Sequence, residues 1–282
     1  MTINEISVVI PFLNEEGSVA DLIEETLAAV QGFDSEIIAV DDGSTDATSA
    51  ILDKLAAQDP RVRVIHHALR RGQSSAIRSG VKAARRNWVA TLDGDGQNPP
   101  DQILSLIGAL PDDAETVGIV QGQRQKRQDT WAKRKASRFA NRLRGSLLQD
   151  GVQDSGCGLK LFRREAWLDM PFFDHIHRFT PAMMKREGWQ VLTAPVSHRA
   201  RQAGKSNYNN LQRALVGIID LIGAAWLIKR SGRPTGIAMS KAAAPRPISA
   251  APHPSATPEA PAGSSPPFPP TSAPGTAEAG PG

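Results

Sequence analysis

Four short apolar runs, rich in β-branched residues and separated by stretches with helical periodicity, constrain the fold of this chain more than any other feature. The runs are Ile6–Ile10, Glu36–Val40, Val62–Ile65 and Trp88–Leu92. The stretches between them are Val19–Val30, Thr45–Ala57 and Ser74–Arg85. This alternation predicts βαβ units and a parallel sheet. Three successive crossovers favour a doubly wound α/β sheet, in which ligands bind at the carboxyl ends of the strands.

The pattern becomes less regular after the fourth run. A helix is expected from Pro99 to Leu110, and a basic helix is expected near residue 130. Further strands are expected at Val117–Gln121, Gly158–Phe162, Val191–Ala194 and Val196–His198, with a short helix at Arg164–Met170 between the second and third of these. The sheet should therefore continue beyond its parallel half.

Leu211–Ile228 is the most apolar long stretch, and Arg213 and Asp220 interrupt it. Its length is near the lower limit for crossing a bilayer, where a central carboxylate would cost a few kcal/mol. We therefore expect an amphipathic helix that lies on a membrane surface or packs on the core.

The C-terminal segment differs in composition from the rest of the chain. From Ala242 onward it consists almost entirely of Pro, Ala, Ser, Gly and Thr, and 12 of the 21 prolines lie between Pro245 and Pro281. So little apolar surface cannot offset the entropy of ordering, which predicts a disordered tail. The expected organisation is a folded domain over residues 1–210, an apolar helix over 211–230 and a tail over 231–282.

Cysteine usage and the N-terminus bear on the compartment. The one cysteine, Cys157, cannot form an internal disulfide, which suits a reducing compartment. Near the start, Glu5 precedes the first apolar run, and no basic region leads into a long apolar segment. These features favour the cytoplasm.

Positive charge is concentrated in one segment. The formal net charge is +4, and nine basic residues lie between Arg124 and Arg144 against one acid, Asp129. Such a run attracts phosphates of lipids, nucleotides or nucleic acids, although it is equally compatible with a solvated helix face. A nucleic-acid partner is disfavoured because no aromatic residues alternate with the basic ones in a recognisable module.

Acidic and amide residues follow three of the four predicted strands. They are Asn14, Glu15 and Glu16 after the first strand, Asp41 and Asp42 after the second, and Asp93 and Asp95 after the fourth. A single Asp in such a place is usually a helix cap. Three clusters at one sheet edge instead predict a binding site.

The segment Asp93–Gln97 (DGDGQ) is the sharpest local signal. Its alternate side chains can direct oxygen atoms at one hard cation, and Mg²⁺ or Mn²⁺ prefers such ligands and commonly bridges them to a substrate phosphate. A calcium loop is disfavoured because no bidentate Glu follows at the required spacing. Zinc is disfavoured because no histidine pair lies near cysteine or carboxylate at structural-zinc spacing. Gly72–Ser75 opens a helix that could receive a phosphate, a weaker signal.

Three segments together resemble family 2 glycosyltransferases of the dolichol-phosphate mannose synthase, or polyprenyl-phosphate glycosyltransferase, type. They are Val9–Glu15 (VIPFLNE), Val40–Asp46 (VDDGSTD) and Leu92–Gln97 (LDGDGQ), and the resemblance extends over most of residues 5–210. Asp154–Lys160 and Arg201–Ser206 resemble later motifs of the same subfamily. Two departures are Asn207, where relatives often have Lys, and Gly94, where mannose synthases commonly have Ala.

The resemblance implies a GT-A fold, a Rossmann-like and mostly parallel sheet, and a set of site residues. It places Pro11, Phe12, Glu15, Asp41 and Asp42 around the nucleotide and gives Asp93, Asp95 and Gln97 to the metal, Mg²⁺ or Mn²⁺. It places Arg124 and Arg134 at the acceptor phosphate, and Arg201 and Ser206 in a loop over the donor diphosphate. Asp93, Asp95, Arg124 and Arg134 are then the expected catalytic residues.

The expected reaction moves a sugar, with inversion, from a nucleotide-sugar donor to a polyprenyl phosphate, for a cell-envelope glycan or for modification of the lipid A part of lipopolysaccharide. The cation stabilises the departing diphosphate, and a phosphate acceptor is already anionic near neutral pH, so it needs no general base. Arginine suits such an acceptor because its planar fork matches phosphate oxygens. The enzyme would then be peripheral on the anionic inner face of the plasma membrane.

Two other functions are compatible with the sequence. One is transfer to sugar hydroxyls of a polysaccharide, although the chain lacks the Gln-x-x-Arg-Trp segment and long membrane spans usual in processive members. The other is a non-catalytic nucleotide-sugar-binding module, which the intact Asp93 and Asp95 disfavour. The segment Thr91–Pro100 resembles bacterial relatives that make polyprenyl-phosphate galacturonate, while glucose and mannose remain open.

Overall fold

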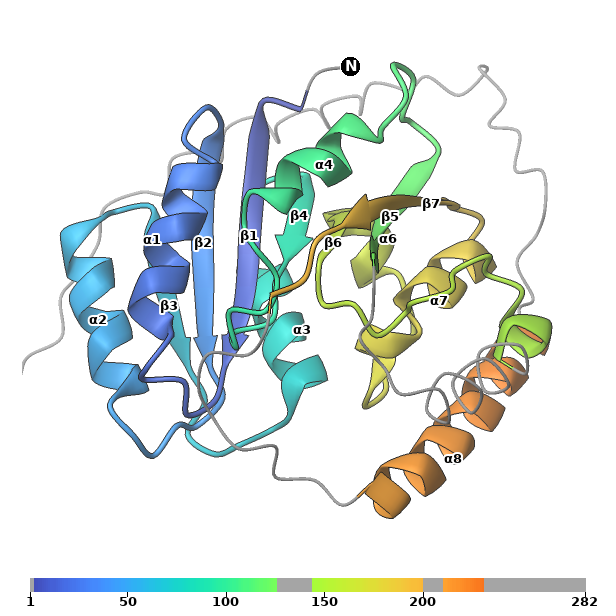
Figure 1. The fold of residues 1–282 in the computed structure, drawn as a ribbon. Coiled ribbons are helices and arrows are strands. Elements are labelled where there is room, and N and C mark those ends of the chain that lie inside the picture. Colours follow the sequence, from blue (N-terminus) through green and yellow to red (C-terminus); the bar gives the residue numbers. More distant parts are fainter. Residues whose placement is uncertain (1–2, 126–143, 200–209, 231–282) are drawn as a thin grey trace, which may run out of the picture. The chain divides into compact units, whose positions relative to one another are not determined.

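The computed structural model of the chain describes residues 3–125, 144–199 and 210–230, shown as a ribbon in Figure 1. For residues 210–216 it describes the backbone alone. The chain divides into two units, Met1–Arg233 and Pro234–Gly282, and the second lies outside the described residues. The elements named below belong to the first unit.

Seven strands form one sheet in the order β3-β2-β1-β4-β6-β5-β7. Their bounds are β1 Glu5–Phe12, β2 Asp34–Asp41, β3 Val62–His66, β4 Trp88–Thr91, β5 Val117–Arg124, β6 Lys160–Arg163 and β7 Gln190–Val196. Strands β1 to β4 are mutually parallel, β6 is antiparallel to β4 and β5, and β7 is parallel to β5. The predicted α/β class with a mostly parallel sheet is confirmed.

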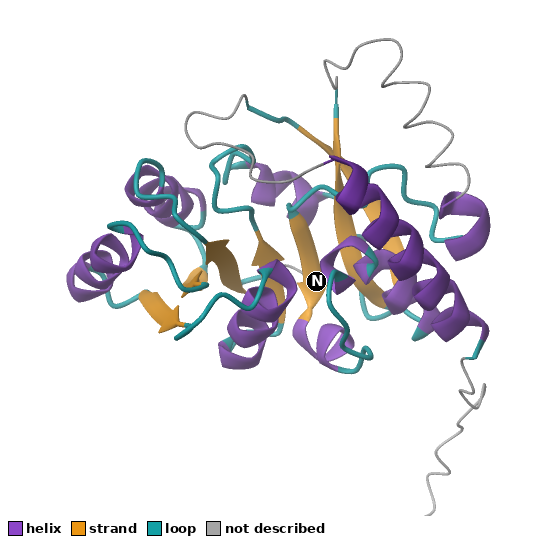
Figure 2. Ribbon diagram, turned by 90° about the horizontal axis from the view of Figure 1, so that it is seen from below, coloured by secondary structure: helices purple, strands orange, loops and turns teal. Residues whose placement is uncertain are grey.

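The helices alternate with the strands in the first half of the chain, as the periodicity predicted. Their bounds are α1 Val19–Ala29, α2 Thr48–Gln58, α3 Gln73–Ala83, α4 Gln102–Gly108, α6 Arg164–Leu168, the short 3-10 helix η1 Ile176–Arg178, α7 Thr180–Arg186 and α8 Asn210–Lys229. Figure 2, which views the molecule from the edge where β1 and β2 end, shows helices on both faces of the sheet.

Each face of the sheet has its own apolar core, because successive residues of a strand point to opposite sides. In β1, Val8 and Ile10 pack with α1, α2 and α4, whereas Val9 packs with α3 and with residues of α6, α7 and α8. Buried strands of this kind are apolar on both faces, which explains the continuous apolar runs in the sequence.

One part of the predicted sheet was wrong. Two closing strands were expected, at Val191–Ala194 and Val196–His198, but β7 is a single strand that passes through Pro195. Because β7 is the last strand in the sheet order, a residue without an N–H group is tolerated there. In the described ranges no helix, including the 20-residue α8, combines the length and hydropathy that a membrane span requires.

Candidate active site

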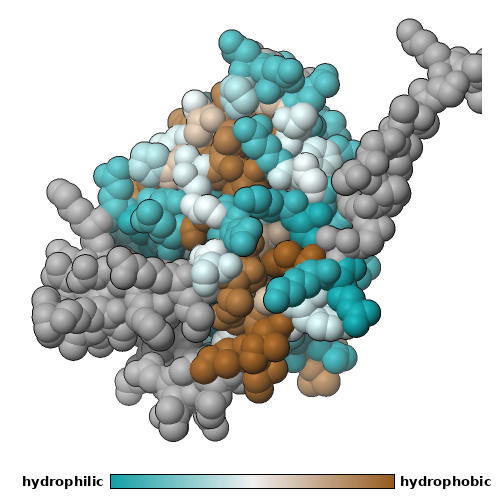
Figure 3. Space-filling view, turned by 90° about the vertical axis from the view of Figure 1, so that its right-hand side faces the viewer, coloured by the Kyte–Doolittle hydropathy of each residue, from teal (hydrophilic) through white to brown (hydrophobic). Residues whose placement is uncertain are grey.

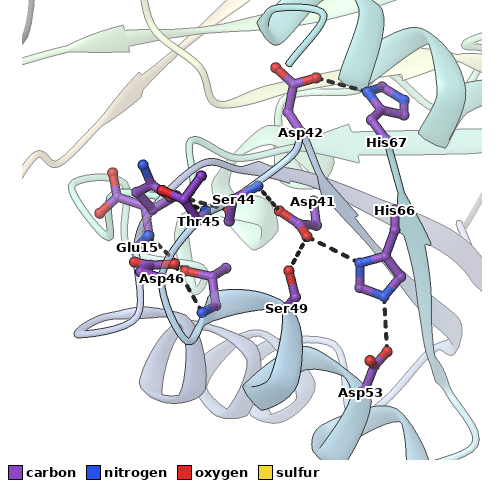
Figure 4. A network of polar contacts seen from close by, with 12 residues as sticks. Glu15, Asp41, Asp42, Ser44, Thr45, Asp46, Ser49, Asp53, His66 and His67 are labelled. Atoms are coloured by element: carbon purple, nitrogen blue, oxygen red, sulfur yellow. Dashed lines mark hydrogen bonds and ion pairs between the residues drawn. The ribbon is translucent and has the colours of Figure 1, made fainter. Parts of the chain in front are cut away.

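The loops that follow β1 and β2 are joined by hydrogen bonds between the side chains of one and the backbone of the other. The amide of Asn14 donates to Ser44 Oγ at 3.0 Å, and the amide of Thr45 donates to Asn14 Oδ1 at 2.8 Å. The amide of Glu15 donates to Thr48 Oγ1 at 2.9 Å. Figure 4 shows this network. Asn14 adopts a left-handed φ of 56°, which its short polar side chain tolerates. Two of the predicted clusters thus form one surface.

Asp41 is almost fully buried at the end of β2 and is surrounded by donors. Its carboxylate accepts hydrogen bonds from the Ser44 amide at 2.9 Å and from Ser49 Oγ, and it lies 3.1 Å from Nδ1 of His66 (Figure 4). Burial raises the pKa of Asp41, but the hydrogen bonds from Ser44 and Ser49 outweigh burial and lower it overall. His66 Nε2 in turn lies 2.9 Å from Asp53.

Asp42 organises the loop that leads into α3. Its Oδ1 accepts the Arg71 amide at 2.8 Å, and its Oδ2 accepts the Gly72 amide at 2.7 Å. His67 Nδ1 lies 2.8 Å from the same carboxylate (Figure 4). Gly72 has a φ of 89°, a conformation that favours glycine. The contacts described for Asp41 and Asp42 are all with protein groups. The predicted contact of these two carboxylates with a nucleotide therefore stays a prediction.

The end of β1 supports the loop after β4. Phe12 is buried in the core, and Pro11 is half-buried beside it. A Cβ atom added to Gly94 would lie 2.4 Å from the Pro11 carbonyl oxygen and 2.8 Å from the Phe12 ring. Glycine at position 94, noted above as a departure from relatives, is therefore required by the close approach of the two loops.

Asp93 lies at the centre of the site. Its Oδ1 accepts a hydrogen bond from Gln73 Nε2 at 2.7 Å, and its Oδ2 accepts one from Asn98 Nδ2 at 3.2 Å. A Cβ atom added to Gly158 would lie 2.1 Å from Oδ2, so the carboxylate rests directly on that glycine. Burial, and then the like charge of Asp95, raise the pKa of Asp93.

The loop from Asp93 to Gln97 suits a divalent cation. Two carboxylates and the Gln97 amide supply oxygen atoms, the donors that Mg²⁺ and Mn²⁺ prefer. A bound divalent cation would offset the like charges of Asp93 and Asp95. The amide of Arg199 donates to the Gln97 carbonyl at 2.9 Å, which ties the segment after β7 to this loop. In the part of the chain that the structure describes, no three His, Cys, Asp or Glu side chains form a metal cluster.

Two cations lie beside this acidic loop. Arg124, at the end of β5, donates two hydrogen bonds to Asp154, and this pairing raises its already high pKa. Lys160, in β6, is almost fully buried and donates to the carbonyl of Cys157. Burial lowers the pKa of Lys160, whereas the nearby charge of Asp93 opposes that shift. Cys157 is buried, and burial raises the pKa of its thiol.

Three predicted site residues, Arg134, Arg201 and Ser206, lie outside the described residues. Among those described, the structure brings together Asp93, Asp95, Gln97 and Arg124 on one side of the site. Glu15, Asp41 and Asp42 lie in the adjoining network at the ends of β1 and β2 (Figure 4).

Several residues in or beside this site were not among the predicted site residues. They are Gln73, Asn98, Asp154, Lys160, His177 and His198. Three of these residues could have been found from the sequence. Asp154 and Lys160 bound the segment that resembles a later motif of the subfamily, and Gln73 lies in the helix start Gly72–Ser75. His198 is affected by the charges of Arg124 and Asp95, and burial, followed by Arg124, lowers its pKa.

The protein-family model described as glycosyl transferase family 2 matches residues 7–169 of the chain. Among curated proteins, the chain is 37% identical over 211 residues to an undecaprenyl-phosphate 4-deoxy-4-formamido-L-arabinose transferase of Enterobacter sp. (strain 638). That match covers 73% of this chain and 63% of the relative. A dodecaprenyl-phosphate galacturonate synthase of Rhizobium johnstonii is 33% identical over 236 residues, with 82% and 69% covered. The chain spans about two thirds of the length of these relatives.

Solved structures show the same fold at low sequence identity. Glucosyl-3-phosphoglycerate synthase of Mycobacterium tuberculosis, in complex with Mn²⁺, uridine diphosphate and glucosyl-3-phosphoglycerate, has a TM-score of 0.59 at 20% identity, with 82% of this chain and 81% of that chain covered. A mannosyltransferase of Pyrobaculum calidifontis, in complex with GDP-mannose and Mn²⁺, has a TM-score of 0.58 at 20% identity, with 79% and 64% covered. The expected GT-A fold is confirmed by these likenesses.

Proposed function

The chain belongs to glycosyl transferase family 2, and from this premise we propose that it transfers a sugar from a nucleotide-sugar donor to a polyprenyl phosphate. The observation that carries the proposal is the placing of Asp93 and Asp95 beside two cations, Arg124 and Lys160. Carboxylates suit a cation that binds the donor diphosphate, and cations suit an anionic acceptor. The curated relatives named above carry a polyprenyl phosphate in their names, which supports the same acceptor class.

The residues of the site support a division of roles. Asp93, Asp95 and Gln97 would hold Mg²⁺ or Mn²⁺, which supplies Lewis-acid stabilisation of the leaving diphosphate. Pro11, Phe12, Glu15, Asp41 and Asp42 would shape the nucleotide pocket, with Arg201 and Ser206 above the diphosphate. Arg124 and Arg134 would orient the acceptor phosphate. Lys160, buried near Asp93, would add positive charge to the site in its protonated form, where low dielectric strengthens the effect of a charge.

The chemistry needs no proton transfer from the acceptor. An oxygen of the phosphomonoester dianion attacks the anomeric carbon from the face opposite the leaving group. A new carbon–oxygen bond forms as the bond to the donor diphosphate breaks, and the nucleoside diphosphate leaves with inversion. A hydroxyl acceptor would require a base instead. Asp154 is poorly suited to that role because its carboxylate is paired with Arg124.

Helix α8 suggests how such an enzyme meets a lipid. Its inner face packs on the core through Ala224 and neighbouring residues, yet its outer face, defined here as Ile218, Ile219, Ile222 and Trp226, is 55–70% exposed. Figure 3 shows exposed apolar residues gathered together on one side of the molecule. The protein core covers the inner apolar face of α8. The outer apolar face therefore needs another apolar environment, such as a lipid surface.

Basic residues continue this surface. Lys229 and Arg230 follow the outer face, and the Arg230 guanidinium lies 5.5 Å from the centre of the Trp226 ring. Basic residues near an anionic leaflet contribute about 1 kcal/mol each to binding. We therefore propose that α8 lies on the anionic inner face of the plasma membrane, with Trp226 at the headgroup boundary.

The decisive experiment incubates pure protein and Mn²⁺ with a panel of nucleotide sugars and with undecaprenyl or dodecaprenyl phosphate. Mass spectrometry of the lipid fraction should show one polyprenyl-phosphate-sugar, formed with one donor. Product on an oligosaccharide acceptor, with none on the lipid phosphates, would favour the hydroxyl-transfer alternative. Donor binding without any product under both conditions would favour a non-catalytic module.

A further inference from the structure

Two consecutive residues at the start of α3 contact two different parts of the molecule. Gln73 Nε2 donates to Asp93 Oδ1 at 2.7 Å, and Ser74 Oγ lies 2.7 Å from His177 Nδ1. Gln73 therefore links α3 to the acidic loop, and Ser74 links α3 to the 3-10 helix η1. Asp93 depends on this arrangement because, in the described structure, Gln73 makes the shorter of its two side-chain hydrogen bonds.

The turn that contains His177 is fixed on both sides. Ile176 and Phe179 are buried in the core that faces α3. Burial also lowers the pKa of His177 well below its ordinary value, which favours the neutral ring that contacts Ser74. His175 adopts a φ of 62°, which is unusual for a residue other than glycine and is maintained by its surroundings.

His175 connects the same turn to α8. Its Nδ1 atom lies 2.9 Å from Oδ2 of Asp220, in the middle of α8. That oxygen is buried and accepts no well-aligned hydrogen bond from the described residues, and its contact with His175 becomes an ion pair when the imidazole is protonated. Arg186 adds a second attachment, because its Nε donates to the Leu227 carbonyl at 3.1 Å. The inner side of α8 is thus tied to η1 and α7.

We propose that Gln73 and His177 are positioning residues for the Asp93 carboxylate and that the turn 175–177 couples the lipid-facing helix α8 to divalent-cation binding. Hydrogen bonds to a metal-ligating carboxylate orient it and raise its affinity for the metal. A lipid surface that restrains α8 also restrains Asp220 and its contact His175. Through His177 and Ser74, the same restraint reaches the start of α3, which carries Gln73. The coupling rests on the proposed function, since it assumes a membrane-facing α8.

Linkage makes the coupling reciprocal. If vesicles tighten cation binding by some factor, the cation must tighten vesicle binding by the same factor. The enzyme would then bind metal and donor best where its lipid acceptor is found. This property can be measured without donor, acceptor or turnover.

The first test measures binding of Mn²⁺ alone by calorimetry, with circular dichroism to confirm folding. Gln73→Ala should weaken Mn²⁺ binding about 10- to 100-fold, the usual effect of losing a hydrogen bond to a metal ligand. His177→Ala should weaken it in the same direction, and His177→Asn, whose side-chain amide occupies the place of Nδ1 and can still bond Ser74, should recover part of the loss. Ser105→Ala, at an exposed serine of α4, is the matched control and should bind as the parent does. Parental Mn²⁺ affinity in Gln73→Ala would overturn the positioning role.

The second test repeats the titration with phosphatidylglycerol vesicles and follows vesicle binding by flotation. Vesicles should tighten Mn²⁺ binding to the parent, and saturating Mn²⁺ should tighten flotation by the same factor. Asp220→Asn should still float but should lose the vesicle effect on Mn²⁺. A full vesicle effect in folded Asp220→Asn, or none in the parent, would overturn the coupling. Neither test measures sugar transfer. A failure of the proposed reaction would therefore leave these binding results standing, and a failure of the coupling would leave the proposed reaction standing.

Discussion

Arg124 and Asp154 form a two-point ion pair across the site, with Nε 2.6 Å from Oδ2 and Nη2 2.8 Å from Oδ1. Both side chains are largely buried, at 19% and 15% exposure. The pair therefore has a structural role as well as the proposed contact of Arg124 with the acceptor phosphate. A double-mutant cycle can separate the two roles.

Arg124→Ala should lower the free energy of unfolding by about 2 kcal/mol, because Asp154 loses its charged donor. Arg124→Ala with Asp154→Ala should recover much of that loss, since no buried charge is left unpaired. Lipid-phosphate transfer should stay low in both variants if Arg124 contacts the acceptor. Chemical denaturation and acceptor titrations measure the two effects, and transfer restored by the second substitution would make Arg124 purely structural.

Asp95→Asn should abolish turnover and leave the fold intact. Its carboxylate lies in the loop after β4 and, among the described residues, accepts a local hydrogen bond from the Gln97 amide at 3.1 Å. Loss of several kcal/mol of metal stabilisation corresponds to about a 1000-fold lower rate. The unfolding free energy should change by less than about 1 kcal/mol. Asp21→Asn, an exposed acid in α1, is the control, and comparable rates in both variants would remove Asp95 from the metal site.

Gly158→Ala should prevent metal binding while largely preserving stability. The new methyl group would lie 2.1 Å from Asp93 Oδ2, and the carboxylate can rotate away more easily than the backbone can move. Calorimetry should show no Mn²⁺ binding, and the melting temperature should fall by only a few degrees. Gly145→Ala, whose added carbon meets nothing within 4 Å, should behave as the parent does.

His66 should make stability depend on pH near neutrality. Its hydrogen bond to Asp53 raises its pKa above the ordinary 6.5, burial opposes the shift, and the Asp41 bond adds to it. Because the pKa of His66 is higher in the folded than in the unfolded state, its protonation stabilises the fold. The stabilisation is complete at pH values below the unfolded-state pKa and is lost as the pH rises through the folded-state pKa.

Asp53→Asn should therefore lower the pKa of His66, seen by NMR titration, and should reduce the fall in melting temperature between about pH 6 and about pH 8. Glu24→Gln, an exposed change in α1, controls for general charge effects. A pH profile of stability that Asp53→Asn leaves unchanged would contradict this assignment.

Ile219→Asp with Ile222→Asp should weaken vesicle binding by at least about tenfold, because two large apolar side chains no longer enter the headgroup boundary. Both residues are more than 60% exposed, so the fold should persist. Leu104→Asp removes an exposed leucine from α4 and is the matched control. Salt should weaken parental binding, leaving a salt-resistant part that the double substitution removes. Equal flotation of all three proteins would rule out α8 as the lipid-facing surface.

The first half of the fold and the acidic part of the site were predictable from the sequence alone. Apolar runs such as Ile6–Ile10 and the helical stretches between them carry a local periodicity, and carboxyl ends of parallel strands always meet at one edge. Because Asp41, Asp42, Asp93 and Asp95 lie at or shortly after the ends of such strands, their positions in the chain are enough to place them near one another. The disordered tail predicted from the composition after Ala242 lies outside the described residues and stays a prediction.

The partners of these residues were decided only by the tertiary structure. The antiparallel placing of β6, the single strand β7 and the pairing of Arg124 with Asp154 depend on contacts between distant segments, which leave no local periodicity. The contact of His177 with Ser74 spans 103 positions, and a hydrogen bond of this kind depends on the packing of the turn against α3. Local pattern determines which elements form, whereas side-chain contacts across the closed core determine which of their polar groups meet.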